Sequence, residues 1–288
     1  MRHLTAICIL LSAGVGVLGA SDWHETVGEM FKNEQWAPAQ HLLEAVVARE
    51  PNNADAWARL GETHLHRNQG EPAVEPMEKA VALDPNNANY QRHLGDAYGL
   101  SAQQASFFSK TGWAVKCKAA YLKAVELDPK SVTNRRSLLE FYRQAPGFAG
   151  GGMDLAYAEA AEIRKLDPTA GEIEFGNLYA SEKKFPEATA AFESALKSTP
   201  DSYAALYQIG RLAAIGQADA GRGLVCLRRC LELPVPKGQP DFSPVQWRLG
   251  NILERQGDKA GARAAYEAAV KADPHFAPAA ESLKKLGE

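Results

Sequence analysis

The chain has 288 residues, of which 45% are hydrophobic and 23% are charged, and its formal net charge is −3. This composition is ordinary for a folded protein, and a slightly acidic chain without a basic stripe argues against a nucleic-acid partner. The longest basic clusters are pairs such as Lys183-Lys184 and Arg228-Arg229, which are typical of solvated helix faces.

The first twenty residues have the features of a signal peptide. Arg2 and the amino terminus supply positive charge, residues 4–18 are apolar or small throughout, and Leu18-Gly19-Ala20 suits a signal peptidase. The apolar stretch is short for a membrane span, and an uncleaved anchor is the alternative. We therefore expect cleavage near Ala20/Ser21 and export to the periplasm, with membrane contact only through envelope partners.

The best-defined structural unit covers residues 54–87. Two short helical patterns are joined there by Asn68-Gln69-Gly70, and Asp84-Pro85 ends the second pattern, because proline has no amide donor and cannot continue a helix. Gly61 and Ala73 lack bulk, so we expect the two helix axes to approach closely at these residues. The other apolar positions of the unit are Trp57, Leu60, Leu65, Met77, Ala80 and Leu83.

The same pattern recurs along the chain. Pro51 and Pro85 are 34 residues apart, as are Trp23 and Trp57, and an Asp-Pro pair closes four of the units. In length and residue pattern these units resemble the tetratricopeptide repeat (TPR) family. The resemblance implies an all-α, right-handed superhelical solenoid of stacked antiparallel helix pairs, with about seven repeats and a carboxyl-terminal capping helix.

On this resemblance, residues 21–288 form a single solenoid domain. One helix pair cannot bury its own apolar face, and stacking of neighbouring pairs supplies the shared core. The first repeat has Thr26-Val27 in place of the Leu-Gly pair that is usual in the family, as expected of a terminal copy. The expected repeats cover residues 21–53, 54–87, 88–131, 132–168, 169–202, 203–242 and 243–276, followed by a capping helix at 277–287.

The third repeat carries ten extra residues around positions 99–113. They include Phe107, Phe108 and Trp113, which are more hydrophobic than a loop requires. Either the insertion lengthens both helices and packs on the neighbouring repeat, or it presents an apolar surface to a partner.

Two further segments interrupt the repeat pattern. Residues 145–152 contain a proline and four glycines, so we expect no α-helix there. A phosphate-binding loop is rejected, because no Gly-Lys-Ser/Thr follows and no strand precedes the segment. The irregular stretch at residues 236–244 is the expected break in helix stacking.

The sequence contains no recognisable catalytic motif, and we predict no catalytic, cofactor-binding or metal-binding residue. Cys117, Cys226 and Cys230 remain after signal cleavage, and an odd number gives no complete disulfide framework. We interpret them as small buried hydrophobic residues. A metal or redox protein that uses Cys226/Cys230 or the pair His66 and His93 is the alternative.

In the TPR family, the first helix of each repeat lines the concave binding face, and the resemblance transfers this role to particular positions. Those in the carboxyl-terminal half pair a large residue with a polar one in three successive repeats, which suits an extended peptide. Alternatively, Tyr207 and Trp247 are core residues. Some family members bind the free carboxyl terminus of a peptide through Lys, Asn and Arg residues in successive repeats, called a carboxylate clamp. That set is absent from this sequence. The predicted partner-binding residues are Arg92, Arg136, Ile173, Asn177, Tyr207, Arg211, Trp247 and Asn251.

These observations predict a non-enzymatic scaffold of the cell envelope that binds a protein or an extended peptide, as a monomer or with weak self-association. An alternative is an accessory or assembly subunit of an envelope or secretion complex, which contacts its partners through the aromatic insertion at residues 99–113. The fold alone does not choose between them.

Overall fold

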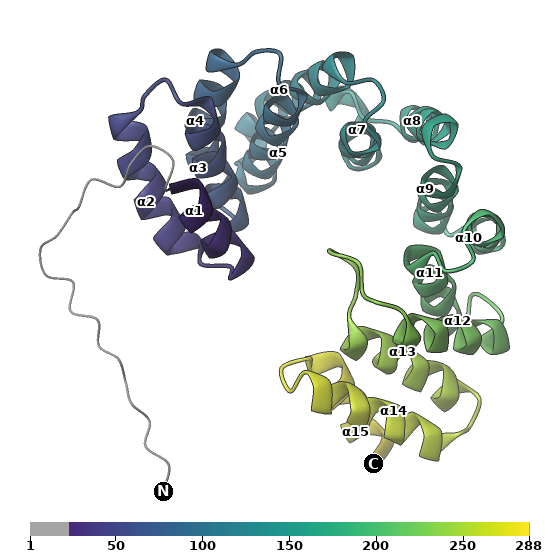
Figure 1. Ribbon diagram of the computed structural model, residues 1–288. Helices are drawn as coiled ribbons and strands as arrows, with labels where there is room; N and C mark the ends of the chain where they lie inside the picture. Colours follow the sequence, from purple (N-terminus) through teal and green to yellow (C-terminus); the bar gives the residue numbers. More distant parts are fainter. Residues whose placement is uncertain (1–22, 288) are drawn as a thin grey trace, which may run out of the picture. The chain divides into compact units, whose positions relative to one another are not determined.

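The computed structural model describes residues 23–287 (Figure 1). The predicted signal peptide and its cleavage site lie outside these residues. Within them there are fifteen α-helices, one short 3-10 helix and no strand. In chain order the helices are α1 (Trp23–Lys32), α2 (Trp36–Arg49), α3 (Ala54–His66), α4 (Gly70–Leu83), α5 (Ala88–Gln104), α6 (Phe107–Leu127), α7 (Val132–Gln144), η1 (Gly147–Ala149), α8 (Met153–Leu166), α9 (Pro168–Ser181), α10 (Phe185–Ser198), α11 (Tyr203–Ala214), α12 (Ala220–Glu232), α13 (Phe242–Arg255), α14 (Lys259–Ala272) and α15 (Ala277–Gly287).

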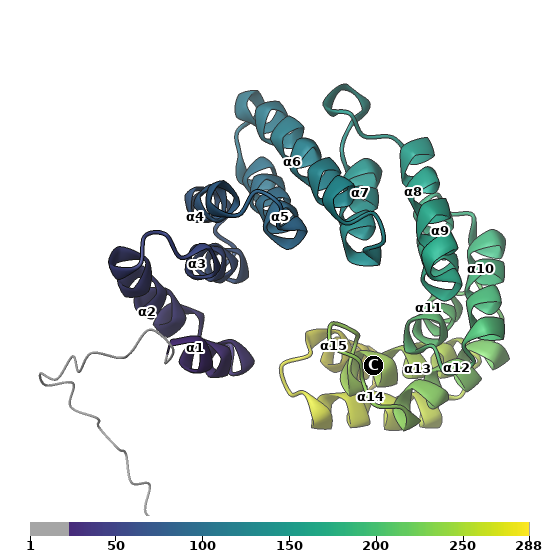
Figure 2. The same cartoon turned by 45° about the horizontal axis from the view of Figure 1, so that its top comes forward.

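The helices pack as consecutive pairs, and we call the first helix of each pair the A helix and the second the B helix. They form two compact units, one ending at Ala120 and the other beginning at Tyr121. In the second unit, α7 to α14 follow one another as four pairs, and α15 packs on α14 (Figures 1 and 2). The predicted all-α stack of helix pairs is confirmed.

In four repeats an A helix crosses its B helix at a glycine, and a large B-helix side chain fills the space there. A Cβ atom on Gly176 would lie 2.3 Å from the fully buried ring of Phe192, so the close approach requires glycine. The close approach predicted at Gly61 is confirmed, since a Cβ atom there would lie 2.7 Å from Met77. The four pairs are Gly61–Met77, Gly176–Phe192, Gly210–Leu227 and Gly250–Tyr266.

Side-chain caps begin many of the helices. The oxygen atoms of Asn53 and Asn87 accept backbone amide hydrogen bonds in the first turns of α3 and α5. Asp167 ends α8 and also caps α9, with Pro168 as the first residue of α9. Because these caps satisfy amides that a helix start leaves without partners, short polar turns are sufficient to connect the repeats.

The insertion at residues 99–113 is helical except at residues 105–106, which join α5 to α6. It extends α5 to 17 residues and α6 to 21 residues, and no helix among residues 23–287 is long and apolar enough to cross a membrane. Trp113 is half-buried with its ring centroid 5.8 Å from that of Tyr98, whereas Phe108 is 93% exposed. The insertion therefore both packs internally and presents apolar surface.

The glycine-rich segment at 145–152 forms no α-helix, as predicted. It contains the single 3-10 turn η1, followed by Gly150 with a φ of +86°, a conformation that glycine adopts without strain. The predicted break in stacking at residues 236–244 is wrong. The Tyr203 hydroxyl donates a hydrogen bond to the Pro240 carbonyl at 2.5 Å, and one apolar cluster continues from α10 to α14.

Candidate partner-binding surface

In the first unit, charged and titratable side chains of α3 and α5 contact one another. The guanidinium of Arg92, a predicted partner-binding residue, lies 3.0 Å from the Asp96 carboxylate. His93 Nδ1 of α5 lies 2.7 Å from Glu62 Oε1 of α3. In this part of the A-helix face, Arg92 and Glu62 therefore already have partners within the protein.

The Glu62–His93 contact predicts a loss of stability in acid. Burial raises the pKa of the Glu62 carboxyl, but the hydrogen bond from His93 and the charges of His93, Arg59 and Arg92 hold this pKa below its usual value of 4.5. A carboxylate with a depressed folded-state pKa stabilises the protein above its unfolded pKa, and the stabilisation is lost as pH falls through the folded pKa. We expect Glu62→Gln to lower the free energy of unfolding by about 1 kcal/mol at pH 7 and by less at pH 3, as measured by urea denaturation. An equal loss at both pH values would contradict this assignment.

Several predicted polar residues are held by neighbouring side chains in the second unit. Arg136 Nε of α7 donates to Glu174 Oε1 of α9 at 2.5 Å, and Asn177 Nδ2 lies 3.5 Å from the other oxygen of that carboxylate. Glu174 is only 6% exposed and was not among the predicted residues. Asn251 Oδ1 accepts a hydrogen bond from the Tyr266 hydroxyl at 2.8 Å.

The large residues of the three predicted large–polar pairs are buried or half-buried. Ile173 is partly buried and packs against the core cluster of the second unit. Tyr207 is 6% exposed, as the core alternative expects. Trp247 is half-buried and donates from Nε1 to Ser282 Oγ of α15 at 3.0 Å. These large residues fill junctions between repeats, and whether they contact a partner stays a prediction.

A cationic pair, Arg211 and Arg248, lies on the neighbouring A helices α11 and α13. Arg248 Nε donates to the Tyr207 hydroxyl at 2.7 Å, and its guanidinium lies over the Tyr207 and Trp247 rings at 5.3 and 5.2 Å from their centroids. Arg211 Nε donates to Gln208 Oε1 at 2.6 Å. Arg248 was not predicted from the sequence, although it follows Trp247 directly. The repeat pattern does not show which arginines form ion pairs with carboxylates.

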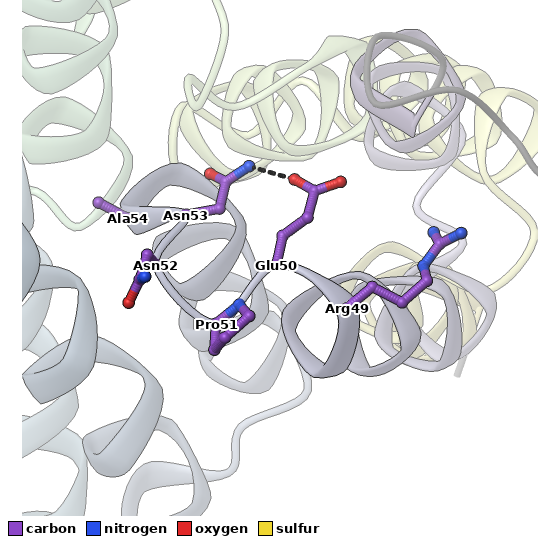
Figure 3. A pocket seen from close by; sticks show the side chains of 6 residues that line it. All are labelled: Arg49, Glu50, Pro51, Asn52, Asn53 and Ala54. Carbon is purple, nitrogen blue, oxygen red and sulfur yellow. Dashed lines mark hydrogen bonds between the residues drawn. The ribbon is translucent and has the colours of Figure 1, made fainter.

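Two surface depressions are lined mainly by residues that stabilise turns. Figure 3 shows an open depression at the turn between α2 and α3, where the Asn53 amide donates to Glu50 at 2.8 Å. Asn53 also caps α3, so the polar groups of this depression serve the turn. Its lining residues are Arg49, Glu50, Pro51, Asn52, Asn53 and Ala54.

A second hollow lies at the turn after α11. Gly216 has a φ of +74°, and a Cβ atom there would lie 2.0 Å from the Arg255 guanidinium. Glycine thus permits the left-handed backbone conformation at this turn and leaves room for the Arg255 guanidinium to pack against it. The other lining residues are Ala213, Ala218, Ala220, Ile252 and Gln256.

The residues of the metal and redox alternative have other contacts. His66 stacks on Trp36 with centroids 3.9 Å apart, whereas His93 contacts Glu62. In the part of the chain that the structure describes, no group of three or more His, Cys, Asp or Glu side chains is arranged to hold a metal ion. Cys226 and Cys230 are free and buried, which agrees with their interpretation as core residues.

The buried thiols of α12 are expected to react slowly. Burial raises the pKa of the Cys226 thiol to about 11 and that of Cys230 to about 12. Because the thiolate is the nucleophile, we expect iodoacetamide at pH 8 to modify both at least about tenfold more slowly in the native protein than in urea. Mass spectrometry of timed samples measures both rates, and equal rates would show that these thiols are accessible.

The fold and this surface define a helical-repeat protein with adjacent A helices that carry polar side chains. Tetratricopeptide repeat models match residues 30–96, 173–225 and 244–276, together more than half of the chain. The chain therefore belongs to the tetratricopeptide repeat family, as its residue pattern predicted. This fold supports a protein-interaction scaffold, and the family is generally non-enzymatic.

Solved structures show the same fold at low sequence identity. A tetratricopeptide repeat protein from Parabacteroides merdae is 14% identical, with a TM-score of 0.60 over 93% of this chain and 98% of that chain. TTC0263, a thermophilic TPR protein of Thermus thermophilus, is 20% identical, with a TM-score of 0.52 over 64% and 94%. A chain of the APC/C hetero-tetramer Cut9-Hcn1 is 15% identical, with a TM-score of 0.56 over 94% and 50%. No curated protein matches the sequence significantly.

Proposed function

We propose that the protein is a non-enzymatic scaffold that binds an extended segment of a partner protein along α9, α11 and α13. The observation that carries the proposal is the difference between α3 and α5 and the later A helices α11 and α13. On α3 and α5 the charged groups pair within the chain, whereas on α11 and α13 the guanidinium groups of Arg211 and Arg248 keep donors available. Such groups suit the hydrogen-bonding backbone and side chains of a peptide.

We further propose that this binding takes place in the cell envelope. The support is the charge and apolar pattern of residues 1–20, which is typical of a signal peptide. Fractionation of cells that express the full-length chain tests this location. Processing near Ala20/Ser21 and recovery with periplasmic markers are expected, whereas an unprocessed chain in the cytoplasm would contradict it.

Position-resolved photo-crosslinking tests the binding surface. A photoreactive amino acid is placed at Asn177 on α9 or at Gln208 on α11, both half-exposed, and at exposed Lys271 on the B helix α14 as the matched control. Partner adducts are expected from the first two positions and not from Lys271. Adducts from Lys271 alone would reject the proposed surface.

A second candidate function is an assembly subunit that receives an apolar helix of a partner on the outer face of α6. Phe108, Gly112, Val115 and Ala119 recur at spacings of four, three and four residues, and all are exposed. This is the spacing of a helix-packing seam, with large and small side chains in alternation. Phe108 is 93% exposed and Val115 55%.

The two candidates give different crosslinking patterns. The second predicts adducts from a photoreactive residue at Val115 and none from Gln208. Its matched control is Val225 on α12, another B-helix valine that is 55% exposed. Equal adduct yields from Val115 and Val225 would reject a specific role for α6.

A further inference from the structure

We infer that the partner segment is acidic, and that Arg211 and Arg248 bind its carboxylates. The inference rests on the proposed function, because it assigns a chemical class to the ligand of that same surface. It depends on the contrast between this arginine pair and the arginines of the earlier A helices α3, α5 and α7.

The arginines on the earlier A helices have carboxylate partners. For Arg211 and Arg248 the structure gives only Gln208, Tyr207 and the two aromatic rings as partners, and no carboxylate among residues 23–287 lies within ion-pair distance of either. The pairs on the earlier helices are Arg59–Asp55, Arg92–Asp96, Arg135–Glu159, Arg136–Glu174 and Arg143–Glu140.

The arginine pair is half-buried and lacks a compensating charge. Burial lowers the pKa of the Arg211 guanidinium, and the nearby positive charge of Arg248 lowers it further. Two like charges in a partly desolvated site destabilise the folded protein unless an anion lies beside them. No described side chain supplies that anion, so a ligand carboxylate is the group that best complements the site.

The hydrogen bonds within the protein leave the Nη groups of both arginines available to donate to a ligand carboxylate. Each arginine uses Nε within the protein, Arg248 toward the Tyr207 hydroxyl and Arg211 toward Gln208. Their terminal Nη groups have no described acceptor and remain for the ligand. Stacking on Tyr207 and Trp247 restrains the guanidinium of Arg248, which lowers the entropy lost on binding. A planar guanidinium with two outward donors matches a carboxylate in a bidentate geometry.

Peptide selection tests the ligand class without knowledge of the partner. A phage library of random twelve-residue peptides is selected in parallel on wild-type protein, on the Arg211→Gln/Arg248→Gln variant and on Arg228→Gln. Arg228 is an exposed arginine on the B helix of the same repeat as Arg211, so its variant controls for the loss of positive charge. Aspartate and glutamate are expected to be enriched on wild type and on Arg228→Gln, and not on the double variant.

The outcomes separate the inference from the proposed function. Peptides that bind along α9, α11 and α13 without acidic enrichment would overturn the inference and leave the scaffold proposal intact. Failure to select any peptide for this surface would count against both. Acidic peptides that bind the double variant as well as wild type would place their site elsewhere and overturn the inference.

A selected acidic peptide, labelled with fluorescein, gives the quantitative test by anisotropy. Arg248→Gln is expected to weaken binding at least about tenfold, since a charge-assisted bidentate contact is lost. Raising the sodium chloride concentration from 50 to 300 mM is expected to weaken binding to wild type more than to the double variant. Thermal unfolding checks that the double variant remains folded, because it loses the Tyr207 and Gln208 contacts together with the repulsion between the two charges. Equal affinities in protein that remains folded would overturn the inference.

Discussion

Replacing Phe192 with alanine is expected to lower the free energy of unfolding by about 3–5 kcal/mol. The Phe192 ring is fully buried between α9 and α10 and fills the space that Gly176 leaves open. Its removal loses apolar burial and leaves a cavity at the crossing of the two helices. Because the same cluster extends through several helix pairs, no single neighbour can collapse to fill that space.

Urea denaturation of the Phe192→Ala variant measures this loss, with Phe148→Ala as the control. Phe148 lies in the turn after α7 and is 75% exposed, so its removal is expected to change stability by no more than about 0.5 kcal/mol. Similar losses in the two variants would show that the helix crossing does not depend on the buried ring.

Two glycine-to-alanine substitutions are expected to have opposite effects on stability. A Cβ atom at Gly210 would lie 2.3 Å from Leu227 of α12, so Gly210→Ala should overpack the crossing and destabilise the protein by about 1–3 kcal/mol. A Cβ atom at Gly112 of α6 meets nothing within 4 Å. Gly112→Ala should therefore stabilise the protein by about 0.5–1 kcal/mol, because alanine loses less backbone entropy in a helix.

Thermal unfolding followed by circular dichroism compares the two glycine variants under one set of conditions. The informative result is that the two changes in unfolding temperature have opposite signs, because helix propensity alone favours alanine at both positions. A rise in the unfolding temperature of both variants would mean that Gly210 is not required for the close approach. Combining Gly210→Ala with Leu227→Ala should recover part of the loss, because the second change removes the atoms that clash.

The repeat fold could be predicted because its signals are local. The helix stop at Pro85 and the cap at Asn87 act within one turn of the chain, and the structure places helix ends there. Gly61 acts across a single helix pair, on Met77 of the next helix. The connector at 236–244 was misjudged because the Tyr203–Pro240 hydrogen bond joins residues 37 apart. No local pattern reveals such a contact.

The candidate surface was predictable only in part. The resemblance assigned Arg136 and Arg211 to A helices, where they lie, but it could not show that Arg136 meets a buried carboxylate while Arg211 has none. That distinction depends on which side chains meet across neighbouring helices. Tyr207 was predicted to face a ligand, yet its ring is buried and its hydroxyl accepts a hydrogen bond from Arg248. Whether these residues contact a partner stays a prediction.

The most direct test of partner binding on the A helices is hydrogen–deuterium exchange with and without a saturating peptide selected on the wild-type protein. The account predicts slower exchange in α9, α11 and α13, with exchange in α6 and α14 unchanged. Protection confined to α6 would favour the assembly-subunit function. Protection confined to the B helices α12 and α14 would contradict both proposed surfaces.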